Sequence, residues 1–134
     1  MHNYMIYLKE KDEMIKELTE DEAYELLSTG RDIDYTDLVT DKDEIRQAIL
    51  QFLREAKIYA GLIETTENGI VLHLAYDNLV NALHMCFDDL EGLWFVNDGG
   101  YEVVTMADYL RILLLNHPGE DVDLEVHAVY DFHF

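Results

Sequence analysis

The sequence predicts one α+β domain over residues 1–134: a largely antiparallel sheet built from two hairpins and a C-terminal strand, with helices packed on one face. Three observations predict it. After residue 40 the chain alternates helical and hairpin patterns and ends in a strand. The final stretch GEDVDLEVHAVYDFHF alternates apolar and polar residues from Val122, as in an antiparallel strand with one covered face. No repeat or Pro/Ser-rich linker divides the chain.

The first forty residues predict a strand, a helix and an acidic connection. The segment NYMIYL, at 3–8, has the composition of a short strand. In TEDEAYELLSTG, Thr19 is an N-cap, Glu22 stands at the capping-box position, and Gly30 supplies the left-handed exit of a helix. RDIDYTDLVT then reads as a connection or a brief strand.

The segment TDKDEIRQAILQFLREAK predicts the clearest helix, with Thr40 as its N-cap. Its apolar residues fall on one stripe, which comprises Ile45, Ala48, Ile49, Phe52, Leu53 and Ala56.

The segment IYAGLIETTENGIVLHLAY predicts a hairpin that turns at Asn68-Gly69. This turn would place Glu64 opposite His73.

The remaining pattern predicts helix, hairpin, helix and strand. A third helix is expected in DNLVNALHMCFDDLEG, and a second hairpin in LWFVNDGGYEVV, with its turn within 97–100. The segment TMADYLRILLLNHPG predicts a helix capped by Thr105 and stopped at Pro118. This last helix is apolar almost all round, which indicates a buried helix or, alternatively, a homodimer contact.

Charge is the most unusual property of the composition. Nine Lys and Arg stand against 29 Asp and Glu, a net charge of −20. Residues 58–134 hold fourteen acidic residues and a single base, Arg111. Such a field repels DNA, RNA and anionic lipid, and it attracts basic surfaces. We therefore expect neither direct nucleic-acid binding nor membrane binding.

The single cysteine, Cys86, excludes an intrachain disulfide. The N-terminal segment is charged too early for a signal peptide, and no apolar run approaches about 18 residues. A reducing, cytoplasmic setting is therefore expected.

No catalytic motif points to an enzyme. The chain lacks a G-x-S-x-G elbow, a P-loop, HExxH, paired CxxC motifs and an EF-hand loop. His84 and Asp88 have helical i,i+4 spacing, and Asp131 and His133 are near neighbours on a strand, but each pair is only the beginning of a site. We therefore expect no enzymatic activity, no cofactor and no bound metal, with histidines solvated among acids.

The C-terminal strand suggests an acidic docking face. Carboxylates at alternate strand positions stand about 6.6–6.8 Å apart, close to the spacing of phosphates along a nucleic-acid strand. The expected row comprises Asp121, Asp123, Glu125 and Asp131. Further acids that would extend it, if the fold brings them to the same side, are Glu120, Asp88, Asp89, Glu91, Asp98 and Glu102. The expected aromatic anchors are Trp94, Tyr101 and Tyr130.

These features favour a non-enzymatic inhibitor or binding protein that docks a basic, nucleic-acid-binding surface of another protein. Phage or mobile-element inhibitors of host defence, such as anti-CRISPR or anti-restriction proteins, and immunity proteins against nuclease toxins share this size and charge. The alternative is a small regulatory domain whose acidity serves solubility only. A metal-dependent enzyme is the third hypothesis.

Overall fold

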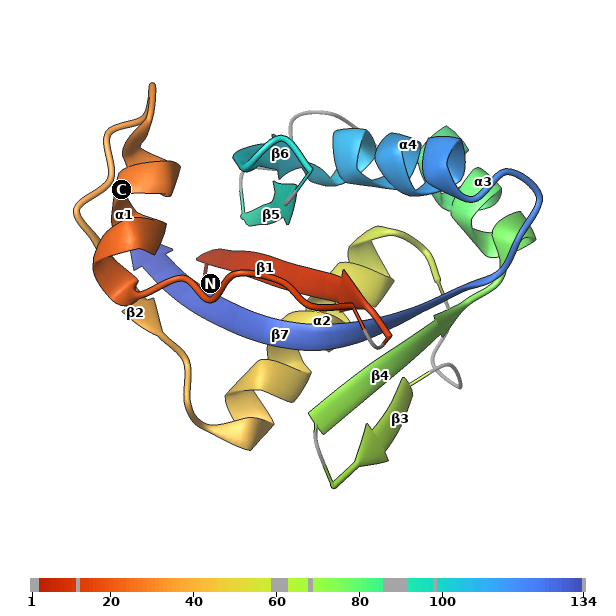
Figure 1. Ribbon diagram of the computed structural model, residues 1–134, viewed down its shortest axis with the longest axis horizontal. Helices are drawn as coiled ribbons and strands as arrows, with labels where there is room; N and C mark the ends of the chain where they lie inside the picture. Colours follow the sequence, from red (N-terminus) through yellow and green to blue (C-terminus); the bar gives the residue numbers. More distant parts are fainter. Residues whose placement is uncertain are drawn as a thin grey trace.

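The computed structural model describes residues 3–11, 13–58, 63–67, 69–85, 92–97 and 99–133. It confirms the α+β fold as a single domain with four helices and a seven-stranded, mostly antiparallel sheet (Figure 1). The elements are β1 (Asn3–Glu10), α1 (Glu20–Ser28), β2 (Tyr35–Leu38), α2 (Lys42–Glu55), β3 (Ile63–Thr66), β4 (Gly69–Leu74), α3 (Tyr76–Met85), β5 (Leu93–Asn97), β6 (Glu102–Thr105), α4 (Met106–Asn116) and β7 (Val122–His133).

The sheet is organised around β7 and β1. The strand order is β3-β4-β7-β1-β5-β6, and β2 also pairs with β7. One edge of β7 pairs with β1 over eight antiparallel positions, from Asn3↔Phe132 to Glu10↔Leu124. The other edge is shared, because β4 pairs with the first part of β7 and β2 with the last. The pairing of β1 with β5 is parallel.

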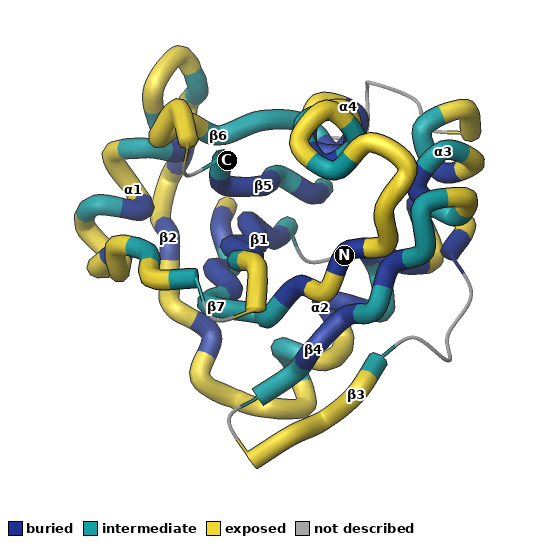
Figure 2. The backbone as a smooth tube through the Cα atoms, turned by 45° about the vertical axis from the view of Figure 1, so that its right-hand side comes forward, coloured by how far each residue is buried: buried dark blue, intermediate teal, exposed yellow. Residues whose placement is uncertain are grey.

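Helices cover both faces of the sheet, whereas the sequence predicted helices on one face only. The large core lies between the sheet and helices α2, α3 and α4, and it includes Phe52, Leu79 and Leu110. The small core lies on the opposite face beneath α1, and it includes Leu27 and Ile33. Figure 2 shows β5 buried between these layers and β3 exposed at the outer edge.

Strand β1 contributes to both cores at once. Tyr4, Ile6 and Leu8 enter the large core, whereas Met5 and Tyr7 enter the small core. All five are buried. Because successive strand residues point to opposite faces, β1 needs apolar side chains at every position in this stretch, and the segment YMIYL supplies them.

A β-bulge at His127 turns over the second half of β7. Tyr7 pairs with Ala128, but the next residue of β1, Leu8, pairs with Val126, so His127 is an extra residue on β7. Before the bulge, Val126 packs on the large core; after it, Val129 does. The even-numbered residues after the bulge therefore face the small core.

The expected burial of alternate β7 residues is confirmed at Val122, Leu124, Tyr130 and Phe132, while Val126 and Ala128 are half-buried. The expectation that these residues share one face was wrong, because the bulge assigns them to two cores. Val122 and Leu124 lie in the large core, but Tyr130 and Phe132 lie in the small one.

Local capping signals are confirmed at two helices and shifted at a third. Thr19 and Glu22 form the capping box of α1, and the Thr105 hydroxyl accepts a hydrogen bond from the Asp108 amide at 3.2 Å. The N-cap of α2 is Asp41 rather than Thr40, with its carboxylate 2.9 Å from the Asp43 amide. Aspartate and threonine are both good N-caps, so sequence did not discriminate between neighbours.

The β3–β4 hairpin has a different register from the expected one. Thr66 pairs with Gly69 and Glu64 pairs with Val71, so Glu64 is not directly opposite His73. The two residues between the strands are 67 and 68, of which 68 lies outside the described residues. His73 still reaches Glu64 diagonally, since such neighbours lie within reach of long side chains.

The hydroxyl of Tyr130 ties β7 to the segment that precedes α1. It donates a buried hydrogen bond of 2.7 Å to the Leu18 carbonyl. Burial raises the pKa of Tyr130 to about 12, so the hydroxyl keeps its proton at neutral pH. This bond fastens α1 over the small core.

We predict that Tyr130→Phe lowers the free energy of unfolding by about 1–2 kcal/mol, because it leaves the Leu18 carbonyl without its buried donor. Urea denaturation measures the loss. Tyr24→Phe is the matched control: its hydroxyl donates to the Ile33 carbonyl at 3.0 Å, but this tyrosine is exposed and water can replace the bond. The control should lose less than about 0.5 kcal/mol. Equal losses would contradict the prediction.

Candidate functional site

The acidic side chains lie at the surface. None of the Asp and Glu residues within the described ranges is buried. Acids exceed bases by 29 to 9, so at least 20 carboxylates are in excess of the Lys and Arg that can neutralise them. Ionised carboxylates are costly to bury, and their exposure leaves a strong negative field around the molecule.

The first part of the predicted acidic row lies on an uncovered sheet face but is largely engaged within the protein. Asp123 Oδ1 is 2.8 Å from His73 Nδ1, and the other ring nitrogen of His73 is 2.8 Å from Glu64 Oε2. Glu125 lies 3.5 Å from the Lys9 ammonium. Asp121 accepts a hydrogen bond from the Tyr76 amide at the start of α3.

Asp131 does not belong to that row. The bulge places it on the opposite face, on the side of Tyr4 and the large core, and directly opposite Asp37 of β2. Like charges directly opposite each other destabilise a sheet. Burial, and then the nearby charges of Glu44 and Asp131, raise the pKa of Tyr4 to about 12. The expected continuous row from Asp121 to Asp131 is therefore corrected to two separate groups.

The expected aromatic anchors have different environments. Tyr130 is only 1% exposed, so its proposed contact with a partner is withdrawn. Trp94 is half-buried beneath the Arg31 guanidinium, 4.2 Å from its ring centre. Tyr101 is 40% exposed and has the Lys16 ammonium 5.2 Å from its ring centre.

Glu102 is exposed and accepts a hydrogen bond from the Asn97 amide group. The other acids expected near these residues, Asp88, Asp89, Glu91 and Asp98, lie outside the described residues, as does Cys86.

The structure reveals a second acidic region, which sequence reasoning passed over. We define the α1–β2 surface as the exposed side chains of residues 17–38 together with Tyr101. This segment carries eight acidic residues and one base, Arg31. The acidic residues are Glu17, Glu20, Asp21, Glu22, Glu25, Asp32, Asp34 and Asp37. Exposed large apolar side chains stand among them: Tyr24, Tyr35, Leu38 and Tyr101 are 38–45% exposed.

Contacts between α1 and β2 hold this surface together. The Tyr24 hydroxyl donates to the Ile33 carbonyl at 3.0 Å, and Glu20 accepts from the Leu38 amide at 3.1 Å. These two bonds bridge α1 to the segment that follows it.

The two ends of the surface are anchored to other elements. At one end, Tyr35 stacks on His133 of β7, with ring centres 5.6 Å apart, and His133 lies 3.0 Å from Asp34. At the other end, Lys16 joins Glu22 at 2.9 Å to the ring of Tyr101.

The single base of this segment is held against the protein. Arg31 donates to the Leu27 and Thr29 carbonyls and stacks on Trp94, and burial lowers its pKa. The carboxylates around it therefore face solvent with little neutralisation from their own segment. Exposed aromatic side chains among charges are typical of protein-binding surfaces.

A separate hollow of about 500 Å³ lies where β2 and β4 leave β7 uncovered. In the described pairing, residues 126–128 have no strand partner on this edge. Its lining mixes signs, with Lys42 and Arg46 against Asp43 and Glu67. His127 also lines it, and burial lowers the pKa of this imidazole, with Lys9 acting in the same direction against Glu17. The lining therefore favours neither cations nor anions.

Within the described residues, no three His, Cys, Asp or Glu side chains are grouped so as to hold a metal ion. None of the described helices combines the length and apolar character needed to cross a bilayer. Comparison of the chain with protein-family models, with curated proteins and with solved structures finds no match.

The Glu64–His73–Asp123 cluster predicts a pH-dependent contribution to stability. Hydrogen bonds from Asp123 and Glu64 raise the pKa of His73. A raised folded-state pKa stabilises the protein fully below the unfolded-state value of about 6.5, and this contribution is lost as pH rises through the folded-state value. Because the three side chains are 41–58% exposed, solvent limits the effect to below about 1 kcal/mol.

We predict that the stability advantage of the wild type over His73→Gln is larger at about pH 5.5 than at about pH 9. Urea unfolding of both proteins at each pH measures it. Sodium chloride at about 0.5 M should reduce the advantage at the lower pH. An advantage that grows with pH would refute the assignment of His73 as a cation between two carboxylates.

Proposed function

We propose that this protein is a non-enzymatic binding protein that docks its α1–β2 surface on a basic surface of another protein, and that this basic surface handles nucleic acid. The observation that supports the proposal best is the combination of eight carboxylates with exposed Tyr24, Tyr35, Leu38 and Tyr101 along α1, β2, their connection and the β5–β6 turn, although Tyr35 and Asp37 lie on the face of β2 that points away from α1. Carboxylates alone would give attraction with little specificity, whereas aromatic side chains supply buried contact area at the centre of an interface.

Electrostatics favour a partner rich in Lys and Arg. The net charge of −20 extends the attraction beyond the contact itself and speeds encounter, most strongly at low ionic strength. At physiological salt the Debye length is about 8 Å, so carboxylates close to the interface dominate. A basic surface that could match these carboxylates is characteristic of proteins that neutralise nucleic-acid phosphates. Occupying such a surface blocks nucleic acid, which is the action of an inhibitor or an immunity protein.

The proposed docking does not depend on a continuous row of phosphate-like carboxylates along one strand. Asp123 and Glu125 are engaged by His73 and Lys9, and Asp131 faces the other way. A curved surface built from α1, β2 and the β5–β6 turn presents acids in several directions instead. We therefore propose electrostatic competition with nucleic acid rather than close imitation of its helical geometry.

We predict that the double variant Asp21→Lys/Glu25→Lys slows association with the partner about tenfold or more at low salt, because two attractive charges on exposed α1 positions become repulsive. The matched control is Glu67→Lys/Asp77→Lys, which makes the same change in net charge at exposed positions outside the α1–β2 surface. It should slow association less than about threefold. Surface plasmon resonance over a salt series measures the rates.

The partner for this measurement is obtained by immobilising the protein, applying an extract of the source organism and eluting with a salt gradient. Each captured protein is then purified and bound to a labelled DNA or RNA duplex. We expect the acidic protein to displace that duplex from its partner. Partners that bind it and nucleic acid together with unchanged affinities, or capture that is indifferent to salt, would contradict the proposal and favour a regulatory domain whose acidity serves solubility.

A further inference from the structure

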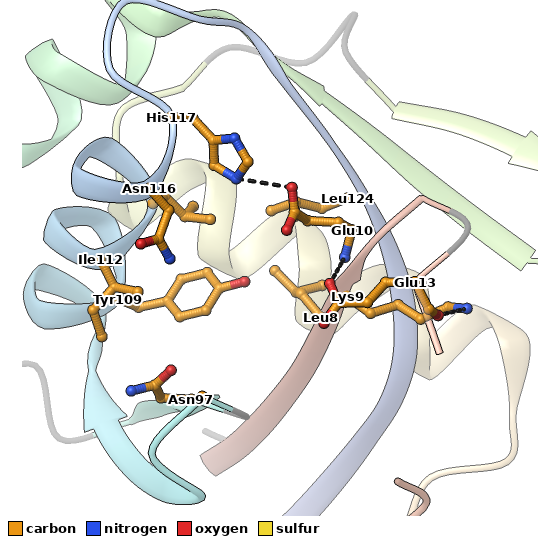
Figure 3. Close-up of a pocket in the computed structure, with 12 residues that line it drawn as sticks. Leu8, Lys9, Glu10, Glu13, Asn97, Tyr109, Ile112, Asn116, His117 and Leu124 are labelled. Atoms are coloured by element: carbon orange, nitrogen blue, oxygen red, sulfur yellow. Dashed lines mark hydrogen bonds and ion pairs between the residues drawn. The ribbon is translucent and has the colours of Figure 1, made fainter. Parts of the chain in front are cut away.

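A second hollow, of about 270 Å³, opens between the end of β1, helix α4 and the β5–β6 turn (Figure 3). Its walls are apolar where α4 and the sheet meet, at Ile112, Leu113 and Leu124. Figure 3 shows Tyr109 extending from α4 across the hollow towards Leu8. The Tyr109 ring is fixed by stacking on Phe95, with ring centres 4.8 Å apart.

The rim of this hollow carries several hydrogen-bond acceptors, beside the Lys9 ammonium and the His117 imidazole. Glu10 and Glu13 supply carboxylates, and Asn97 and Asn116 supply amide groups. The Asn97 amide nitrogen donates to Glu102 at 3.3 Å, which leaves its carbonyl oxygen as an acceptor. The side chains therefore combine an apolar wall with a polar, negative mouth.

One internal contact orients the carboxylate of Glu10. Its Oε1 lies 2.8 Å from His117 Nε2, and this contact fixes one oxygen while the other stays available. The neighbouring base, Lys9, is engaged elsewhere, because its ammonium donates to the Glu13 carbonyl at 3.0 Å and lies 3.5 Å from Glu125. The titratable lining is thus two carboxylates, one committed ammonium and the His117 imidazole that contacts Glu10.

The hollow adjoins the α1–β2 surface through two short segments. Glu13 lines the hollow, and three residues later Lys16 contacts Glu22 and Tyr101. On the neighbouring turn, Gly99 lines the hollow and Tyr101 belongs to the α1–β2 surface. A partner seated on that surface therefore reaches the mouth of the hollow without crossing the molecule.

We propose that this hollow receives an arginine side chain of the docked partner. The inference rests on the proposed function and extends it by naming a specific anchor. A guanidinium offers five donors in a planar fork, suited to acceptors placed around a rim, and its methylene stem matches the apolar wall. The volume lies just below the range of pockets that hold drug-sized ligands, and it suits a single side chain.

The test uses the whole protein and a free probe, N-acetyl-L-arginine amide, and follows backbone amides by NMR. We expect saturable shifts centred on Asn97, Gly99 and Asn116, with a dissociation constant in the millimolar range because one exposed side chain makes few contacts. N-acetyl-L-citrulline amide, the uncharged isostere, should bind at least about fivefold more weakly.

Matched variants distinguish binding in the hollow from attraction by the overall negative charge of the protein. Glu10→Gln, and independently Glu13→Gln, should weaken arginine binding about fivefold, whereas Glu67→Gln, which removes one charge from the β3–β4 turn, should change it less than about twofold. Thermal denaturation verifies that each variant is folded. If one of the two rim variants does not fold, the other carries the test.

Equal binding of citrulline, shifts spread over the whole acidic surface, or unchanged binding in both rim variants would each overturn the inference. The probe experiment needs no partner, so its result is independent of the capture experiment. If arginine does not bind in the hollow, docking through the α1–β2 surface is not contradicted. If no basic partner is captured, the hollow can still bind the probe.

Discussion

The antiparallel pairing of β1 with β7 is the contact on which both cores depend. These two strands form the centre of the sheet, and the side chains of β1 enter the large core and the small core alternately. Without β7, the residues Met5 and Tyr7 would lose Tyr130 and Phe132 as neighbours in the small core. Without β1, the strands on either side would have no common partner. The helices add cover to this pair, and α1 depends on it most, because it lies over the small core alone.

Repulsion among its own carboxylates opposes the folding of this protein. A compact chain with a net charge of −20 is destabilised by its own field. Histidines and lysines from distant segments reduce that cost locally, as His73 does between Glu64 and Asp123, and as Lys9 does beside Glu125. On the α1–β2 surface Lys16 relieves Glu22 and His133 lies beside Asp34, but the single base within the segment itself, Arg31, is turned onto Trp94. Retaining so many carboxylates there is understandable if another protein supplies the missing positive charge.

Helices, strands and caps could be predicted well because their signals are local in the sequence. Strand register and the faces that distant segments share could not, because they depend on contacts between residues far apart in the chain. Thr19, Glu22 and Thr105 act within four residues of their own helices, so their caps could be recognised directly. The bulge at His127 could not, because it depends on how β1 registers against β7, and its one local sign is the apolar run of Ala128, Val129 and Tyr130, which interrupts the alternation. Asp131 was misplaced for that reason. The candidate surface was missed for a related one: counting bases along the chain directs attention to residues 58–134, whereas the fold gathers residues 17–38 beside Tyr101 and His133.

The central strand pair also bears on the order of assembly. Between 114 and 129 positions of sequence separate the partners along β1 and β7. Closing a loop of that size must be paid for in chain entropy before any of the central ladder forms. The helices and the β3–β4 and β5–β6 hairpins have short-range contacts and are free to form early, but neither core closes until the last strand joins the first. Folding of this domain is therefore expected to be slow relative to helical proteins of equal length, with its interior open to water until a late step.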